Sequence, residues 1–170
     1  YDYRKNSIYK TYLACDAVSD EVLLRNHYRC NKEIIGFNNK KYYNSKLQIQ
    51  SKSRETHPLV YVDVKSNQPQ IKNTSPAEVD EVVAYAQQNP DKSIAVITPF
   101  VNQKTLIEQA IKENELENLV CGTVHAFQGD EKDVVLFSTA LSDRTNTGTY
   151  QWLKNNKELI NVATSRAKDK

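Results

Sequence analysis

Residues 123 to 140 read TVHAFQGDEKDVVLFSTA and divide into two halves of different character. The second half, from Val134 to Ala140, is an apolar run typical of a strand that is buried on both faces. The first half places the polar residues Gln128 to Glu131 in a turn around Gly129, a residue that adopts backbone angles other residues resist. Such a turn is either a plain connection between two pieces of core or the place where the domain holds a ligand.

Three further stretches carry residues that could do chemistry: HYR at 27–29, TPFVNQ at 98–103 and NVATSRAK at 161–168. Each has an ordinary structural explanation when taken singly. Tyr28 and Arg29 could be a surface pair ahead of a helix, and the TP dipeptide could simply end a strand. Arg166 could complement the dipole of a helix and cap its last carbonyls. A function is indicated only by the four stretches together.

The elements that would position these stretches alternate between strand and helix patterns. A helix is predicted after Ser75, which is followed by Pro76 and Glu78 in a capping box, and Pro90 ends it. A second helix carries the apolar stripe of residues 106–111, and a third begins near Leu159. Strands are predicted at 59–64, 94–97, 119–124 and 134–141. Residues 31–44 look helical but are interrupted by a glycine, and the polar residues 142–158 are expected to include a loop.

This alternation predicts an α/β fold with a mostly parallel sheet covered on both faces. Ligands of such sheets sit beyond the carboxyl ends of the strands. The turn at Gln128 and Gly129 follows the strand that carries Val124, and is therefore expected at that edge.

In this order and at these separations, the four stretches resemble the second RecA-like domain of superfamily 1 helicases, in the branch typified by the nonsense-mediated-decay RNA helicase and its bacterial relatives. The family pattern is a Tyr-Arg element before a helix, a TPY strand end followed by Gln, a TV-x-x-FQG-x-E turn, and NVA-x-[ST]-RA-K. The matching segments are 28–29, 98–103, 123–131 and 161–168, so the resemblance runs from about Leu23 to the end. Phe100 stands where Tyr is usual, and His125 where an acidic residue is common.

The resemblance implies a RecA-like three-layer fold with a mostly parallel central sheet flanked by helices. Residues 1–170 would form a single domain, with residues 1–22 as a lead-in segment. Because the chain contains no Met, we expect it to be a fragment of a longer protein.

For ATP chemistry, the resemblance implies that Arg29 and Arg166 are catalytic arginines that reach the γ-phosphate. A planar guanidinium stays charged and can hold two phosphate oxygens at once. ATP is thus the implied cofactor, with Mg²⁺ held by the first RecA-like domain. None of the four glycines of this chain opens a GK[ST] phosphate loop, so the isolated chain is expected to be inactive.

The remaining nucleotide contacts implied by the resemblance come from Tyr28, Gln128, Gly129 and Glu131. Tyr28 would stack on the adenine ring, and Glu131 would accept hydrogen bonds from the ribose hydroxyls. Gly129 would let the backbone approach the phosphates closely. The turn would then line the nucleotide site and also transmit motion from that site to the nucleic-acid strand.

For nucleic acid, the resemblance implies contacts from Thr98, Pro99, Thr123, Val124 and His125. Hydroxyls and backbone amides at these positions can hold phosphates without reading sequence. The implied partners are single-stranded DNA or RNA and the first RecA-like domain of the same chain.

The amino-acid composition of the chain limits the kinds of binding site and location that it can have. The net charge of +2 gives at most a weak overall attraction to nucleic acid, so a binding surface must arise from the local placement of charges. Cysteines without CxxC spacing indicate a reducing cytoplasm, and the histidines lack metal-ligand spacing. No run approaches a membrane span. Two alternatives stay open. One is a non-catalytic RecA-like module that binds nucleic acid or a partner protein; such a module would not need the two arginines or Glu131. The other is a helicase domain that serves a fused nuclease.

Overall fold

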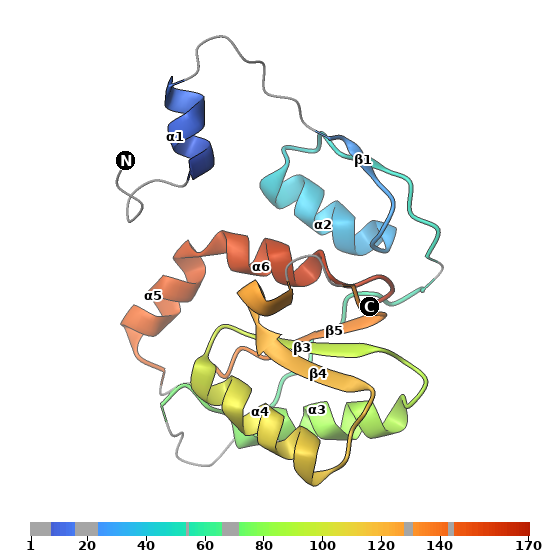
Figure 1. Ribbon diagram of the computed structural model, residues 1–170, viewed down its shortest axis with the longest axis vertical. Coiled ribbons are helices and arrows are strands. Elements are labelled where there is room, and N and C mark those ends of the chain that lie inside the picture. The colour runs from blue at the N-terminus through green and yellow to red at the C-terminus, as the bar shows by residue number, and fades with distance from the viewer. Residues whose placement is uncertain (1–7, 16–23, 54, 66–71, 128–130, 143–144) are drawn as a thin grey trace.

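The computed structural model describes residues 8–15, 24–53, 55–65, 72–127, 131–142 and 145–170, and Figure 1 shows their arrangement. The described helices are α1 (Ile8–Cys15), α2 (Lys32–Tyr42), α3 (Pro76–Gln88), α4 (Val101–Glu113), α5 (Thr147–Asn155) and α6 (Lys157–Thr164), with a 3₁₀ turn, η1 (Val124–Phe127). The described strands are β1 (Asn26–His27), β2 (Gln48–Ile49), β3 (Ile94–Thr98), β4 (Leu119–Thr123) and β5 (Val134–Phe137).

The larger sheet has the strand order β4-β3-β5, and both pairs of strands are parallel. Ile94 at the start of β3 is in register with Leu119 of β4 and Val134 of β5. Strands β1 and β2 form a separate parallel pair. The predicted α/β fold with parallel strands flanked by helices is therefore confirmed.

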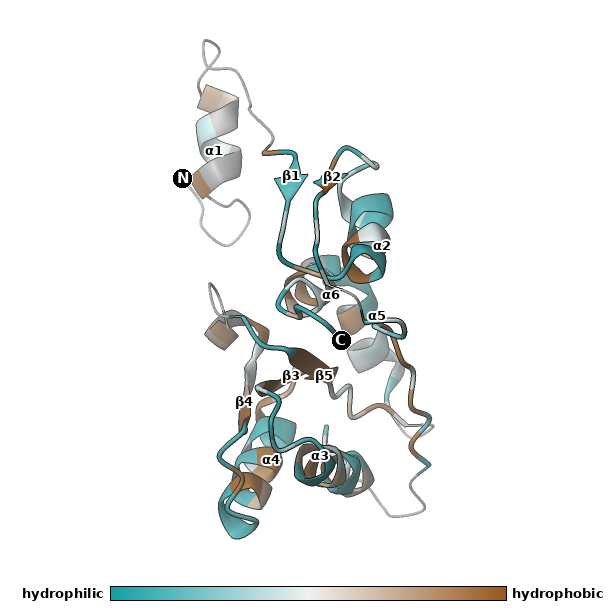
Figure 2. Ribbon diagram, turned by 90° about the vertical axis from the view of Figure 1, so that its right-hand side faces the viewer, coloured by the Kyte–Doolittle hydropathy of each residue, from teal (hydrophilic) through white to brown (hydrophobic). Residues whose placement is uncertain are grey.

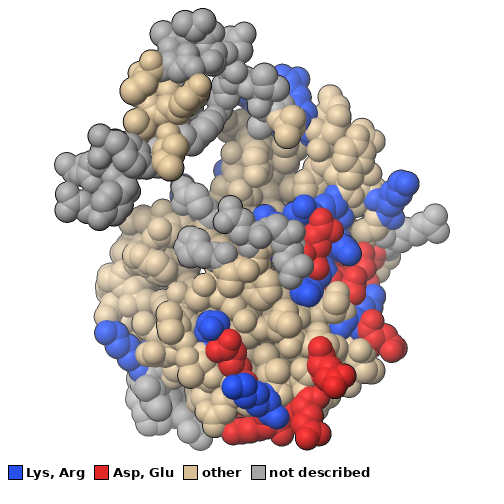
Figure 3. Space-filling view, in the orientation of Figure 1, with Lys and Arg blue, Asp and Glu red and all other residues tan. Residues whose placement is uncertain are grey.

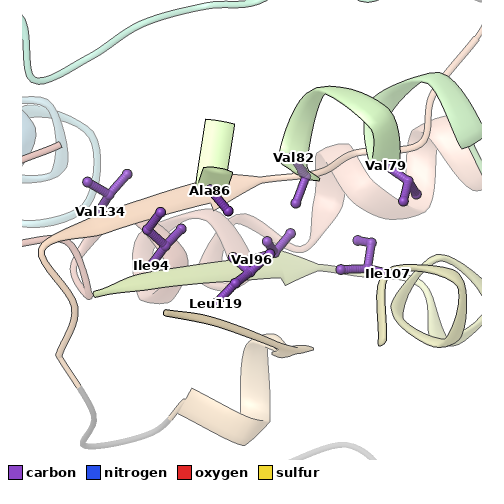
Figure 4. Close-up of a cluster of buried hydrophobic side chains, with 8 residues drawn as sticks. All are labelled: Val79, Val82, Ala86, Ile94, Val96, Ile107, Leu119 and Val134. Atoms are coloured by element: carbon purple, nitrogen blue, oxygen red, sulfur yellow. The ribbon is translucent and has the colours of Figure 1, made fainter. Parts of the chain in front are cut away.

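Helices α3 and α4 cover one face of this sheet, and α6 covers the other (Figure 1). Every residue of β3 is buried, so the strand reads as a continuous apolar run rather than an alternating one. Its side chains alternate between two cores. The core toward α3 and α4 is shown in Figure 4 and consists of Val79, Val82, Ala86, Ile94, Val96, Ile107, Leu119 and Val134.

The opposite face of β3 presents Ala95 and Ile97 to a second core, which includes Phe127 from η1 and Ala163 from α6. A third cluster packs Ile34 and Ile35 of α2, together with Cys30, against Ala167, which follows α6. In Figure 2 the apolar strands β3 and β5 lie between the layers, with α3 and α4 below them and α6 and α2 above. The order of layers is thus α3/α4, sheet, α6 and α2.

Local sequence explains the helix starts. The Ser75 side chain accepts a hydrogen bond from the Glu78 N–H, and Asn31 accepts one from the Glu33 N–H at the start of α2. Helix α2 continues through Gly36, where an added Cβ would meet nothing within 4 Å. The predicted interruption is therefore wrong, because the cap and the buried residues around the glycine hold the helix together.

The strand predicted at 59–64 is also wrong. The structure assigns no strand there, and Leu59, Val60, Tyr61 and Val62 are 51%, 57%, 87% and 60% exposed. Strand propensity alone does not form a strand, since a neighbouring strand must supply the hydrogen bonds.

Three boundaries also differ from the sequence predictions. Strand β5 ends at Phe137 rather than at 141. The Ser138 N–H still donates to the Ile97 carbonyl (3.0 Å), but the Ala140 N–H turns to Glu78 Oε2 (3.1 Å). Val124 belongs to η1 rather than to β4. The polar stretch 142–158 contains the whole of α5, which begins after an Asn146 cap whose side chain accepts from the Thr149 N–H. Among the described helices, none combines the length and apolar character needed to cross a bilayer.

Candidate functional site

Charged side chains from three distant segments meet around Glu131, which lies just before β5. The Arg29 Nε lies 2.5 Å from Glu131 Oε1, and the Lys168 Nζ lies 4.0 Å from Glu131 Oε2. The side chains of Arg29 and Glu131 are 32% and 35% exposed. The carboxylate thus lies between two cations, all on partly exposed side chains, although the Arg29 Nε atom itself is buried. We call these three residues, together with Arg166, the charged cluster.

Backbone hydrogen bonds hold the segments of the cluster together. The Lys132 N–H donates to the Arg166 carbonyl (3.2 Å), and the Lys168 N–H donates back to the Lys132 carbonyl (2.9 Å). The Asn31 N–H donates to the Lys168 carbonyl (2.7 Å). The chain around Arg29, the chain before β5 and the chain after α6 are therefore fixed to one another independently of the charged side chains.

A buried polar contact fixes α2 against α6, the two helices that flank the cluster. The Thr164 hydroxyl donates to Asn38 Oδ1 (2.8 Å), and the fully buried Asn38 amide lies 3.5 Å from the Asn161 carbonyl. The Asn161 amide donates to the Tyr43 hydroxyl (3.2 Å). Residues of the NVATSRAK stretch thus also have a structural role, which the sequence patterns did not reveal.

Cys30 and His27 support the chain on either side of Arg29. Burial raises the pKa of the Cys30 thiol to about 11, so the thiol stays protonated and lies 3.3 Å from the Ser165 carbonyl that it contacts. The His27 Nε2 accepts a hydrogen bond from the Cys30 N–H (3.1 Å). Burial, reinforced by the positive charge of Arg29, lowers the pKa of His27. Both groups are therefore neutral, and neither competes with Arg29 for an anion.

The chain at Arg29 lies beside the chain at Arg166, since the Sγ of the adjacent Cys30 contacts the Ser165 carbonyl (3.3 Å). The two arginines differ in their contacts. Arg29 is paired with Glu131, whereas the Arg166 Nε donates to the Val162 carbonyl of its own helix (3.4 Å). The contact with the Val162 carbonyl fits the structural explanation given above, in which Arg166 caps carbonyls of its own helix. The catalytic role of Arg166 stays a prediction.

The nucleotide contacts predicted next to the cluster are only partly visible. Tyr28 is 65% exposed, so its ring is accessible for stacking. Gln128 and Gly129 lie outside the described residues. Glu131 is described, and it is engaged with Arg29, a contact that the sequence did not predict.

The residues predicted to bind nucleic acid meet at the carboxyl ends of β3 and β4. Thr98 is in register with Thr123, which brings the two stretches side by side. Thr98 is fully buried and its hydroxyl accepts from the Phe100 N–H (3.3 Å), while Val124 is buried in the second core. Contacts to nucleic acid from these two residues would have to use the backbone. Pro99 and Thr123 are half-buried, and the His125 side chain lies outside the described part.

Gln103, which belongs to the TPFVNQ stretch, is fully buried and links three elements. Its Oε1 accepts from the Ser75 N–H (2.7 Å), and its Nε2 donates to the Ser138 hydroxyl (3.0 Å). That hydroxyl donates to Glu78 Oε2 (2.7 Å), which also accepts from the Ala140 N–H (3.1 Å). Gln103 therefore joins the start of α3 to the end of β5.

Sequence reasoning missed a groove of about 670 Å³ between the start of α4 and α5. Pro99 and Phe100 line it on one side, and Trp152, which is 45% exposed, lines it on the other. A helix could have been predicted here from the sequence, because Asn146 can cap a helix that carries apolar residues at positions 152 and 153. That helix, α5, forms this wall of the groove. We call it the α4–α5 groove.

Charge is not gathered into a single positive surface on the face in Figure 3. Acidic side chains gather on its lower part, and basic and acidic side chains interleave on its right. Within the described ranges, no group of three or more His, Cys, Asp or Glu residues is placed to hold a metal ion.

Comparisons with known proteins agree with this geometry. A family model described as an AAA domain matches residues 5–170. The chain is 26% identical to the RNA helicase Mov10l1 of Mus musculus over 91% of its own length, and 27% identical to "Uncharacterized ATP-dependent helicase MG140" of Mycoplasma genitalium over 87%. It is 24% identical to the 3'-5' exoribonuclease HELZ2 of Mus musculus over 88%.

The chain spans 16%, 15% and 6% of the lengths of these three proteins. Each alignment nevertheless covers most of the chain, and the family model covers nearly all of it. The chain belongs to the AAA-domain family that forms the C-terminal RecA-like domain of superfamily 1 helicases, related to Mov10-type and helicase-with-zinc-finger proteins.

Proposed function

We propose that this chain is the second motor domain of an ATP-dependent superfamily 1 helicase that acts on DNA or RNA. It supplies two arginine fingers and one wall of an ATP cleft, and it forms part of a track for a single strand. The observation that carries the proposal is the charged cluster. Arg29 and Lys168 both lie next to the Glu131 carboxylate, and Tyr28 beside Arg29 is exposed. The Arg166 carbonyl accepts from the N–H of Lys132, the residue after Glu131.

The cluster has the composition that phosphoryl transfer requires. Transfer of the γ-phosphate gains most from positive charge positioned before the reaction begins. Arg29 is already oriented by Glu131, so little reorganisation is needed when a triphosphate arrives. Arg166 would exchange its contact with the Val162 carbonyl for a phosphate oxygen, a stronger acceptor because it is charged.

Glu131 would have two tasks in this cleft. One is to hold Arg29 through Oε1, and the other is to accept hydrogen bonds from the ribose hydroxyls. Tyr28 would stack on the adenine, with Gln128 and Gly129 at the phosphates. ATP is the cofactor, and Mg²⁺ would be held by the first motor domain, since this chain has no phosphate loop.

The nucleic-acid track would run along the carboxyl edge of the sheet. Thr98 and Thr123 bring the ends of β3 and β4 together there, followed by Pro99 and by Val124 and His125. Backbone groups at this edge hold phosphates without reading bases.

The test replaces Arg29 and Arg166 separately by Ala and by Lys in the protein that contains both motor domains. We expect the Ala variants to lose about 10³- to 10⁵-fold in kcat with little change in ATP affinity, since the contacts strengthen in the transition state. The Lys variants keep the charge but lose the planar fork, and should be slowed as well. Arg25→Ala is the matched control, because Arg25 is an exposed arginine close to Arg29 in the chain but outside the charged cluster.

Single-turnover ATPase rates and thermal melting of the same proteins separate catalysis from structure. An Arg166→Ala protein with a lower melting temperature and normal turnover would show that Arg166 only caps its helix. The 170-residue chain alone serves as the blank, and magnesium-dependent turnover by it would contradict the two-domain arrangement.

A further inference from the structure

We propose that the α4–α5 groove is a base-stacking subsite for single-stranded nucleic acid, with Trp152 as its platform. The inference rests on the proposed function and extends the track to a residue that the family-like motifs do not include. It begins from an aromatic ring in an unusual position.

Trp152 is half-exposed at the wall of a hollow rather than buried in a core. Its ring centroid lies 6.1 Å from that of Phe100, with the two planes inclined by 37°. Phe100 itself is only 8% exposed. The indole is therefore supported from behind by a buried ring, while 45% of the tryptophan remains accessible. A large, rigid and accessible aromatic face is what a base needs for stacking.

The other lining residues fit a nucleotide better than an apolar protein segment. Asn102, Asn146 and Thr149 offer amide and hydroxyl groups, and Lys72 offers a positive charge. The Asn102 amide is held by the Lys72 carbonyl (3.0 Å), which fixes this side of the groove. Among the described residues that line the groove, none is acidic. Positive charge along the backbone path and an aromatic platform for the bases are the means by which proteins bind single strands without sequence preference. Lys72 and Trp152 supply one of each here.

The groove also continues the proposed track. Pro99 follows β3 directly and lines the groove, while Thr98, just before it, pairs in register with Thr123 of β4. A strand whose phosphates follow the edge of the sheet from β4 to β3 therefore arrives at Trp152. This continuity selects single-stranded nucleic acid as the occupant.

The test uses the 170-residue chain, in which Trp152 is the sole tryptophan and its fluorescence reports on the groove alone. Two probes are compared: a short oligothymidine and an abasic strand with the same backbone. We expect the oligothymidine to quench the fluorescence of the wild-type chain and the abasic strand to leave it unchanged. This measurement needs no variant and is independent of how substitutions affect folding.

Variants then measure the contribution of the ring to affinity. Trp152→Ala should bind the oligothymidine about 5- to 150-fold more weakly, the range expected for loss of one stacked base, and the abasic strand as before. Trp152→Phe, which keeps a smaller ring, should fall between the two. Tyr150→Ala is the matched control, because Tyr150 is a 53% exposed aromatic residue of α5 that does not line the groove. It should bind both strands like the wild type.

Four outcomes would overturn the inference. Wild-type binding to both strands without quenching, or an equal loss on both strands in Trp152→Ala, would remove the stacking role and leave the proposed function intact. Failure of the wild-type chain to bind either strand would contradict the track itself and the subsite with it. Quenching by a partner protein without any strand would show that the groove is a protein interface.

Discussion

Replacing Gln103 with Leu tests whether this residue of the TPFVNQ stretch acts on stability rather than on ligands. Leu has nearly the same volume as Gln but cannot form hydrogen bonds, so the packing is kept while the polar contacts are removed. The Ser75 N–H loses the acceptor that lies 2.7 Å away, and the Ser138 hydroxyl loses a donor at 3.0 Å.

The magnitude follows from burial. Ser75 is 2% exposed, so water cannot replace the missing acceptor of its N–H, at a cost of about 1–3 kcal/mol. The lost contact to Ser138 adds about 1 kcal/mol. The Ser75 carbonyl keeps a partner, because the Val79 N–H also donates to it (3.2 Å). We expect a total of about 2–4 kcal/mol, a large part of the roughly 5–15 kcal/mol that stabilises a typical domain.

Urea unfolding of the chain, followed by the fluorescence of Trp152, measures this loss. The control is Gln109→Leu on the same helix, where the exposed Gln109 amide donates to the Glu113 carboxylate, also at the surface. That substitution should change the free energy of unfolding by less than about 0.5 kcal/mol. If Gln103→Leu left the free energy of unfolding unchanged but reduced ATP turnover of the two-domain protein, the structural role would be refuted.

Two further predictions concern the glycines of β4 and α2 and the histidine that precedes Arg29. Gly122→Ala should destabilise the domain by about 1–3 kcal/mol in urea unfolding, because the new Cβ would lie 2.7 Å from the Phe127 ring. Gly36→Ala, with nothing within 4 Å of its Cβ, should instead stabilise by about 0.5–1 kcal/mol, and equal effects of the two would contradict this explanation. The pKa of His27 is lowered on folding, so its contribution to stability is present above its ordinary pKa of about 6.5 and is lost as the pH falls through the lowered value. Melting temperatures of wild type and His27→Gln should converge at low pH, where the His27 contact to the Cys30 N–H is lost, and a constant difference would disprove the linkage.

The sequence predicted the elements whose signals are local. The cap at Ser75 and the apolar stripe after it are confirmed in α3, and the apolar run 94–97 is confirmed as β3. The segment 59–64 shows the limit of such signals, because its residues favour a strand only if another strand is available to pair with them. Helix α5 was missed because its polar sequence resembles a loop until Trp152 and Leu153 are placed against neighbouring elements.

The candidate site likewise has features that were predicted from the sequence and features that were not. Arg29, Arg166 and Glu131 were named from the resemblance to superfamily 1 helicases, and the structure brings their segments into one region. The pairing of Arg29 with Glu131 and the burial of Thr98 depend on contacts between distant segments, for which the sequence carries no local signal. The roles of these residues in binding and catalysis stay predictions.

The backbone junction between residues 131–133 and 166–170 has a consequence for how the domain tolerates sequence change. Every residue except proline offers the same N–H and carbonyl groups, so the junction is insensitive to which side chains occupy it. A proline at Lys132 or Lys168 would remove one of its donors, and an insertion would shift the register that the Lys132–Ala167 bridge sets. The spacing between the turn and the last helix is therefore constrained by peptide geometry, whereas the chemistry at the cluster can be altered one side chain at a time.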